Sequence, residues 1–587
     1  MSATAAFVPE TLTAQVTATV SNDAQNKGVN WTLTGIGCTG AACGTVSPAT
    51  SASGVAVTYT APASVPSPAS VTLTATSVTD SAQSNAAAIT ITLPISLTIT
   101  PPYVGSSPAI PIYYPTFASS SYPLQAGQSE SFVATVQNDL GNLGVTWSVS
   151  SPGITCPSSS CISLAEVTTS GVGVIAPAPA GVPVGQSPIP FTLTATSVVD
   201  PTKSISVTIP VSNGIPTATG WFEIPKTLLR PVCPSIPQIL GADGCQAIFS
   251  AWNGAIADTA GERLLFTGGG HQNYWGNEIY SLGLNPSNPG YLAVTQLNQP
   301  VFPTPIPPCT EDWGNPSANP AVPSTPAARE NYGDLAYMPG ANKVWLFGGA
   351  LATSGCRSHG MWTMDLATMA WTRLDTTLTI VPGGSVVLGT TPTDINYSDA
   401  DAASGLVYSY IADADILTSY NPATNTMTAL LTGAFHGTNY RANGIFDPGR
   451  NIFLLAGQGT LAWFDLNTSP PTFHNPSTAI CVSPDSFKSA QDALSPGLAY
   501  DANLDRIIAW AGGSTVYVID TRQATAVTPT IACNALTSYP NGPQAEQING
   551  TFGRFRYFPS SDIFVLLNDW QQNAFALRLP NPLPPGF

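Results

Sequence analysis

The stretch LLFTGGGHQNYWGNEIY, at residues 264–280, joins two apolar runs through a turn that holds three glycines and a histidine. His271 is one of only four histidines in the 587 residues. A second stretch, AYMPGANKVWLFGG at residues 336–349, repeats the order of apolar run, Pro/Gly turn, apolar run and glycine pair. Because turn residues separate short runs of strand-forming residues, both stretches predict antiparallel β-strands.

The same pattern recurs along the C-terminal two-thirds of the chain, at intervals of roughly 40–60 residues. Six copies are visible, at residues 247–284, 336–371, 407–420, 444–465, 498–520 and 554–579, and a seventh, degenerate copy stays open. Serial units of this length predict a β-propeller. We expect Trp221 to Pro225 to supply the outer strand that closes the ring onto the last blade. The glycine pairs and the aromatics that follow them resemble kelch repeats across residues 214–587.

The first 213 residues contain an internal duplication. VNWTL at residues 29–33 matches VTWSV at 145–149, and VTLTATSVTD at 71–80 matches FTLTATSVVD at 191–200. Alternating polar and apolar residues predict two β-sandwiches, at residues 1–95 and 96–213. They resemble bacterial immunoglobulin-like domains, which implies a role as spacer or adhesion module. The predicted fold is therefore all-β, with two β-sandwich (immunoglobulin-like) domains followed by a six- or seven-bladed kelch-like β-propeller.

Charge and cysteine content restrict the partners and the compartment. The net charge is −16, which argues against binding nucleic acid through its phosphates. No run of 18 apolar residues is present, so we expect no membrane insertion. The ten cysteines fall into five neighbouring pairs, which predict disulfides in a secreted protein: Cys38/Cys43, Cys156/Cys161, Cys233/Cys245, Cys309/Cys356 and Cys481/Cys533. The first residues lack a signal peptide, and we expect that one has been removed.

Propeller geometry places the chemistry on one face. The loop with His271 joins the second and third strands of its blade, and such loops open on the same face as the loops that lead into each inner strand. Arg329 and Tyr332 lie in a loop of the latter kind. Candidate substrate-binding residues for this face are Asn273, Tyr274, Trp275, Glu278, Tyr397, His436, Tyr440, Arg441 and Arg554. The repeated Asn-Tyr pairs also suit structural turns, and the arginines also suit structural ion pairs.

The segment around His271, with Arg329 and Tyr332 one blade later, resembles propeller-type polysaccharide lyases that act on uronate-containing polymers, the ulvan lyases among them. By this resemblance His271 is the base that removes the C5 proton, Tyr332 is the acid and Arg329 holds the uronate carboxylate. The chain departs from the family at residues 250–253, which lack a second histidine. The favoured interpretation is a polysaccharide lyase whose partner is a polysaccharide or cell-surface glycan.

Two other functions stay open. A non-catalytic glycan-binding, adhesion or structural surface protein needs no acid and base, so it tolerates the missing histidine. A copper-radical oxidase of the galactose oxidase type has a similar layout, but the Tyr-His pair of that family is absent here. No cofactor is expected with certainty. The alternation of Asp399 with Asp401, and of Asp413 with Asp415, suits a structural Ca²⁺.

Overall fold

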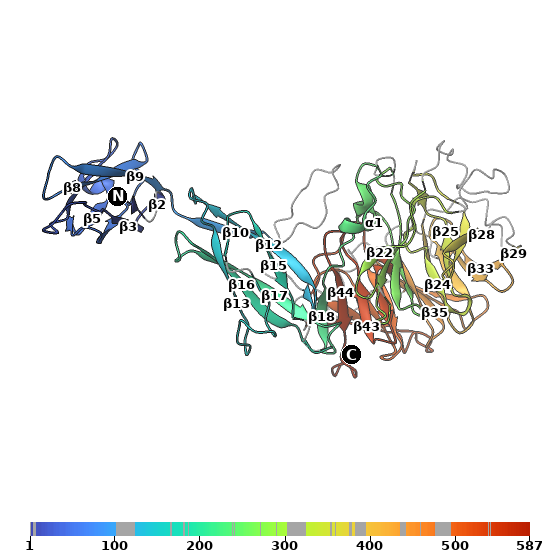
Figure 1. The fold of residues 1–587 in the computed structure, drawn as a ribbon. Helices are drawn as coiled ribbons and strands as arrows, with labels where there is room; N and C mark the ends of the chain where they lie inside the picture. Colours follow the sequence, from blue (N-terminus) through green and yellow to red (C-terminus); the bar gives the residue numbers. More distant parts are fainter. Residues whose placement is uncertain are drawn as a thin grey trace. The chain divides into compact units, whose positions relative to one another are not determined.

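The computed structural model describes residues 2–3, 7–100, 124–164, 167–179, 182–185, 187–236, 239, 241–270, 272–288, 290–301, 325–352, 355–358, 360–374, 379–381, 395–434, 442–457, 460–475, 495–537, 539 and 542–587. In these residues the regular structure is almost entirely β-strand, with one short α-helix, α1 (Ala247–Ser250) (Figure 1). The chain divides into two compact units, one ending at Asn213 and one beginning at Gly214.

The first unit contains two separate hydrophobic cores, each enclosed by two sheets. One sheet around the first core consists of β1 (Ser2–Ala3), β3 (Thr13–Thr17), β7 (Ala56–Thr60) and β5 (Thr45–Ser47). The other consists of β2 (Phe7–Pro9), β9 (Ser84–Thr92), β8 (Ser70–Ser77), β4 (Val29–Thr34) and β6 (Thr50–Ser51). One sheet around the second core consists of β10 (Ser96–Thr100), β12 (Ser129–Gln137) and β15 (Gly173–Pro177). The other consists of β11 (Leu124–Gln125), β17 (Ser204–Ser212), β16 (Ile189–Ser197), β13 (Val145–Ser150) and β14 (Val167–Thr168).

The two sandwiches repeat one another down to single hydrogen bonds. Each has one parallel strand pair, β2 with β9 and β11 with β17. The buried Trp31 indole donates to Ser51 Oγ at 3.0 Å, and the equivalent Trp147 indole donates to Thr168 Oγ1 at 2.8 Å. The duplication seen in the sequence therefore extends to the fold. The immunoglobulin-like assignment and the boundary between residues 95 and 96 stay predictions.

The second unit consists mainly of six sheets of four or five strands, antiparallel except for the parallel pair of β29 and β33. The first sheet consists of β19 (Ala255–Asp258), β20 (Arg263–Phe266), β21 (Tyr280–Gly283) and β22 (Val294–Gln296), and the second of β24 (Ala336–Met338), β25 (Lys343–Phe347), β27 (Met361–Asp365) and β28 (Ala370–Arg373). The third consists of β30 (Asn396–Ala400), β31 (Val407–Ile411), β32 (Ile416–Asn421), β33 (Thr426–Thr432) and β29 (Thr379–Val381), and the fourth of β34 (Asn443–Asp447), β35 (Ile452–Gly457), β36 (Thr460–Asp465) and β37 (Thr472–His474). The fifth consists of β38 (Gly497–Asp501), β39 (Arg506–Trp510), β40 (Val516–Asp520) and β41 (Ala532–Leu536), and the sixth of β42 (Phe555–Phe558), β43 (Ile563–Leu566), β44 (Ala574–Arg578) and β18 (Gly220–Ile224).

The inner strands of these sheets form a closed ring. Contacts run in the order β19, β24, β30, β34, β38, β42 and back to β19. The ring is closed by β18, which pairs with β44 in the register Trp221 opposite Leu577, as the sequence predicts. This arrangement is consistent with a β-propeller, and the ring of described strands has six blades.

One feature of the turns helps to set the register of every blade. The residue at the end of the first hairpin turn has a positive φ, which allows the chain to reverse tightly into the second strand. These residues are Glu262, Asn342, Gly405, Asn451, Asp505 and Asp562. In the last two blades a tyrosine five residues earlier donates to the turn carboxylate, from Tyr500 to Asp505 at 2.8 Å and from Tyr557 to Asp562 at 2.7 Å.

Three of the five predicted disulfides are present: Cys38–Cys43, Cys156–Cys161 and Cys233–Cys245. Cys356 is also disulfide-bonded, but its predicted partner, Cys309, lies outside the described residues. Cys481 lies outside them too, while Cys533 is buried in β41. The disulfides are consistent with an extracytoplasmic location. No helix among the described residues has the length and apolar character needed to cross a membrane.

Candidate functional site

The loop that carries His271 is held against the start of the second blade. Gly269 N donates to Arg329 O at 2.7 Å, and Gln272 N donates to Ala352 O at 2.6 Å. Arg329 lies in β23 (Arg329–Glu330), which pairs with β26 (Ala350–Leu351). His271 itself lies outside the described residues, as do His436, Tyr440 and Arg441. The loop nevertheless lies beside the segment from Arg329 to Tyr332, as the sequence predicts.

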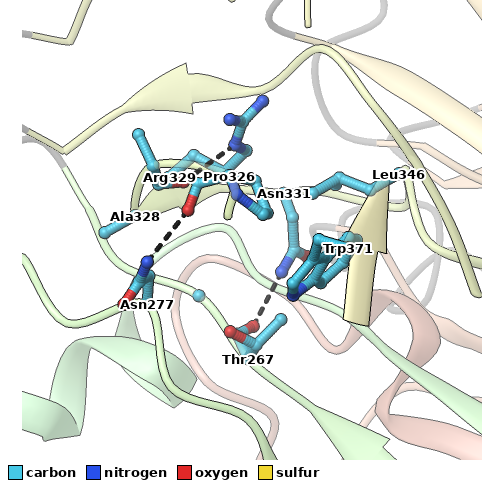
Figure 2. Close-up of a pocket in the computed structure, with 10 residues that line it drawn as sticks. Thr267, Asn277, Pro326, Ala328, Arg329, Asn331, Leu346 and Trp371 are labelled. Carbon is cyan, nitrogen blue, oxygen red and sulfur yellow. Dashed lines mark hydrogen bonds between the residues drawn. The ribbon is translucent and has the colours of Figure 1, made fainter. Parts of the chain in front are cut away.

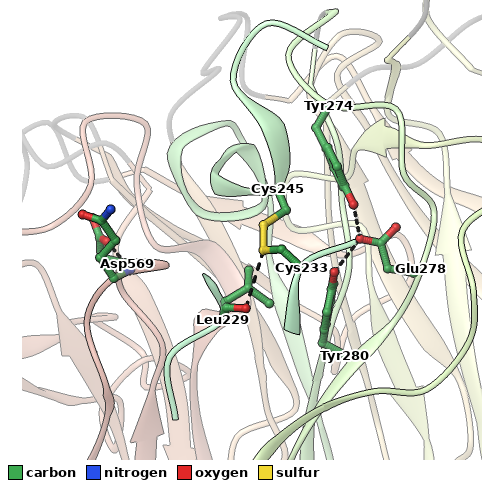
Figure 3. Close-up of a disulfide and its surroundings, with 8 residues drawn as sticks. Leu229, Cys233, Cys245, Tyr274, Glu278, Tyr280 and Asp569 are labelled. Carbon is green, nitrogen blue, oxygen red and sulfur yellow. Dashed lines mark hydrogen bonds between the residues drawn. A yellow bond between two sulfur atoms is a disulfide. The ribbon is translucent and has the colours of Figure 1, made fainter. Parts of the chain in front are cut away.

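Two of the predicted binding residues, Tyr274 and Glu278, lie inside the first blade. Glu278 is 1% exposed, and its Oε1 accepts hydrogen bonds from the hydroxyls of Tyr274 and, at 2.7 Å, of Tyr280 (Figure 3). Burial raises the pKa of the Glu278 carboxyl and of both phenols. Because the three polar groups face one another in the core, this cluster organises the loop and does not present groups to a ligand.

Arg329 is also engaged within the protein. Its side chain is 2% exposed, and Nε donates to Ala327 O at 3.0 Å while Nη1 donates to Gly348 O at 2.6 Å and Ser358 Oγ at 2.9 Å. Figure 2 shows the hydrogen bond of Nε to the backbone of the segment that precedes Arg329. A substrate carboxylate would have to displace these bonds, so the position suits a residue that braces β23.

Arg554 joins the last blade to the first. It is fully buried, and its guanidinium donates to Leu567 O at 3.2 Å, to Gly550 O and to Asn253 O. It also lies over the Phe249 ring, 5.5 Å from the ring centre. Burial lowers the pKa of Arg554 to about 10. The geometry is that of a structural clasp across the closure of the ring.

The described Asn-Tyr pairs are likewise built into the blades. Asn331 Nδ2 donates to Thr267 O of the preceding blade at 2.7 Å, and Asn396 Nδ2 donates to Phe347 O at 2.9 Å. Tyr397 is fully buried, and its hydroxyl accepts from Ala442 N at 3.3 Å. These contacts favour the structural interpretation of the repeated pairs. Asn273 and Trp275, by contrast, are partly exposed.

Tyr332 has the position that most suggests function among the predicted residues. Its hydroxyl donates to Glu330 Oε2 at 3.1 Å, and its backbone has a φ of 45°, a conformation that aromatic residues rarely adopt. A Cβ built on Gly270 would lie 3.4 Å from Glu330 Oε1, so the carboxylate of Glu330 is next to the loop that carries His271.

Around Tyr332 lies a group of aromatic residues that we call the mouth cluster: Trp252, Tyr332 and Phe552. The Tyr332 ring centre is 6.4 Å from that of Trp252 and 6.0 Å from that of Phe552. Tyr332 N also donates to Trp252 O at 2.8 Å. Phe552 has a φ of 49°, so two of the three members have the same unusual backbone. Trp252 is partly exposed, whereas Tyr332 and Phe552 are buried.

The mouth cluster lies where the chain enters inner strands. Trp252 is three residues before β19, Tyr332 four before β24 and Phe552 three before β42. Residues 549–552 were expected at the mouth from their position before an inner strand, but neither Phe552 nor Trp252 was predicted as a site residue. The available signal was an aromatic residue one or two positions before a glycine at the start of three blades: Trp252–Gly254, Tyr332–Gly333 and Phe552–Gly553.

The cavity shown in Figure 2 does not provide a second site for a sugar. It lies between the first two blades, lined among others by Thr267, Asn277, Arg329 and Trp371, and has a volume of about 20 Å³. That is room for roughly one water molecule. Asn277 already donates to Pro326 O at 3.0 Å across it.

The predicted calcium ligands are not gathered into a site. Asp399 accepts from Phe446 N at 3.0 Å, Asp401 accepts from Ala403 N at 2.9 Å, and Asp415 accepts from the Tyr410 hydroxyl at 2.9 Å. In the described part of the chain, no group of three or more His, Cys, Asp or Glu side chains is arranged to hold a metal ion.

The chain matches no protein-family model and no curated protein. Solved structures with remote similarity include an auxiliary nutrient binding protein from Bacteroides thetaiotaomicron, with 8% identity, a TM-score of 0.34, and coverage of 78% of this chain and 95% of that one. The Niastella koreensis GH74 enzyme has 12% identity, a TM-score of 0.25, and coverage of 67% and 42%. The GH74 xyloglucanase from Xanthomonas campestris has 12% identity, a TM-score of 0.28, and coverage of 69% and 48%.

This chain therefore spans less than half of each GH74 protein. The three likenesses are too remote to carry an argument about what this chain binds.

Proposed function

We propose that the chain is a secreted carbohydrate-binding protein that holds a glycan at the mouth cluster. The observation that supports this proposal is the partly exposed Trp252 ring, which packs against the buried Tyr332, while Tyr332 in turn packs against the buried Phe552. Both Tyr332 and Phe552 have left-handed backbone conformations. Each such conformation costs about 1–3 kcal/mol and persists where the surroundings impose it, often at binding sites. An indole that is apolar on its faces and polar at its edge is suited to pack against a sugar ring.

A second candidate is the β-elimination suggested by the resemblance to polysaccharide lyases. It is favoured by the pair of Tyr332 and Glu330 beside Gly270, since His271 is the next residue. In this mechanism His271 removes the C5 proton, and the Tyr332 hydroxyl protonates the leaving oxygen while Glu330 orients it. The buried Arg329 then acts as a positioning residue that braces Glu330, and the uronate carboxylate needs a different cation.

The binding proposal is tested by affinity electrophoresis of the full chain through gels that contain neutral or acidic polysaccharides. Trp252→Ala is expected to weaken binding by about 0.5–1.5 kcal/mol, or roughly two- to twelve-fold in Kd, because the stacking surface is lost. Trp371→Ala is the matched control, since this partly exposed tryptophan lies on the outer strand β28. Equal retardation of the wild type and Trp252→Ala would refute the proposal.

The lyase candidate is tested on the same polymers by the ultraviolet absorbance of the unsaturated uronate product. Formation of this product by the wild type supports β-elimination, and its loss in both His271→Ala and Tyr332→Phe shows that the reaction requires both residues. If the wild type retains binding but forms no product on any uronate polymer, elimination is excluded for those polymers.

A further inference from the structure

Arg556 is a buried cation whose hydrogen-bonding capacity is largely unused. It is the second residue of β42 and is 9% exposed. Its Nε donates to Ala255 O at 3.2 Å and to Gly553 O at 3.1 Å. Within the described part of the chain, neither Nη1 nor Nη2 makes a hydrogen bond. Arg329 and Arg554, by contrast, use their Nη groups on carbonyl oxygens.

The electrostatic partner of Arg556 indicates that its guanidinium is directed toward the centre of the propeller. It interacts electrostatically with Asp399 of β30, and in the cyclic order of inner strands β30 is opposite β42. Such an interaction between opposite blades crosses the central channel. The two side chains form no direct ion pair among the described residues. Asp399 accepts one hydrogen bond at each oxygen, from Phe446 N and from Ala400 N, both at 3.0 Å.

The neighbouring glycine makes room for this arrangement. A Cβ built on Gly553 would lie 2.0 Å from Ala255 O and 2.7 Å from Arg556 Nη2, so any other residue would displace both the backbone of β19 and the guanidinium. Burial of the cation lowers the pKa of Arg556, and the Nη groups are not among the buried polar atoms that lack a partner, so they remain open to solvent. A largely buried cation that keeps solvent-accessible donors is a candidate for binding.

We propose that Arg556 binds the oxyanion of an acidic sugar, in a subsite directly inside the mouth cluster. Phe552, a member of that cluster, is adjacent to Gly553 in the chain and lies three residues before β42. The two free Nη groups form a planar fork that matches a carboxylate or a sulfate. Asp399 retains lone pairs that accept hydrogen bonds from hydroxyls of the same sugar. This inference rests on the proposed function and refines it to uronate or sulfated glycans.

The test compares four small ligands by saturation-transfer NMR on the full chain: methyl glucuronide, methyl glucoside, methyl glucoside 6-sulfate and acetate. We expect a charged glycoside to bind about ten-fold tighter than the neutral one, as for a charge-assisted hydrogen bond. Whichever charged glycoside is preferred identifies the anion as carboxylate or sulfate. Arg556→Gln is expected to abolish the preference, Arg556→Lys to retain part of it, and Asp399→Asn to increase it. Arg522→Gln is the matched loss of an exposed arginine.

Equal binding of charged and neutral glycosides to the wild type, or a preference that survives in Arg556→Gln, overturns the proposal. If Arg556→Gln fails to fold, the Arg556→Lys and Asp399→Asn variants decide: unchanged preference in both overturns it. Trp252→Ala separates the two proposals, because it weakens all glycosides and leaves acetate unaffected. If no glycoside binds the wild type, the proposed function is refuted, and binding of acetate then tests the anion site at Arg556 by itself. An acetate saturation-transfer signal that is lost in Arg556→Gln supports the anion site. The lack of an acetate signal, or a signal that does not require Arg556, overturns the proposed anion site.

Discussion

Replacing Arg554 with methionine is expected to destabilise the propeller by about 2–5 kcal/mol. The guanidinium is fully buried and bonds three carbonyl oxygens, two of them in the last blade and one, Asn253 O, at the start of the first. A hydrogen bond to a charged group contributes about 1.5–3 kcal/mol. The cost of burying the cation, which lowers the pKa of Arg554 to about 10, offsets about 3 kcal/mol of the total.

Urea unfolding followed by tryptophan fluorescence measures this effect. Ten of the twelve tryptophans lie in residues 214–587, so the signal reports on the propeller and only weakly on the sandwiches. Arg522→Met, on an exposed side chain, is the control and is expected to change the free energy of unfolding by less than about 0.5 kcal/mol. If Arg554→Met is as stable as this control, Arg554 is not a clasp. Its predicted role in binding substrate would then regain support.

Three further variants test separate features. Gly553→Ala is expected to displace both the Ala255 backbone and Arg556, which lowers stability, and to reduce binding of charged glycosides by the folded variant more than of neutral ones in the NMR assay. An equal reduction for both would contradict the proposed anion site. Burial raises the folded-state pKa of Glu278, so its contribution to stability is full below the unfolded-state pKa near 4.5 and is lost as pH rises through the folded pKa. In Glu278→Gln this decrease of Tm with rising pH should be absent. Parallel Tm–pH curves for the variant and the wild type would show that ionisation of Glu278 does not cause the decrease. Arg450→Ala removes a bidentate contact with Asp505 and should cost about 1–2 kcal/mol in urea unfolding, whereas no change would show that solvent screens the pair.

The fold was largely predictable because its signals are local and repeated. The apolar runs and the turns between them recur in each blade, the glycine pairs recur in three of the six, and the closing strand is marked by Trp221. The blade count needed the structure, since only the contact between β42 and β19 shows that six inner strands complete the ring. The matched bonds of Trp31 and Trp147 follow from the duplication in the same local way.

The site was less predictable, because residue type does not reveal where a side chain finds its partners. Tyr274 and Arg329 have the chemistry of binding residues, yet both are buried with partners that the sequence places close by. Trp252 and Phe552 were not chosen as site residues because they are 300 residues apart, and the closed ring brings both of them against Tyr332. A contact between the first and last blades cannot be recognised from the sequence of any single repeat.

The surroundings of the arginines provide the strongest reason to place ligand binding in the channel. In a chain with 33 acidic and only 17 basic residues, a carboxylate is readily available to pair with each cation. Arg263 and Arg450 have such partners, and Arg554 has three carbonyls. Arg556 has Asp399 across the channel at a distance that leaves both side chains without direct contact. If Arg556 and Asp399 served only stability, we would expect them to form a direct ion pair. A ligand with an anionic group at one end and hydroxyls at the other would instead bind between the two side chains.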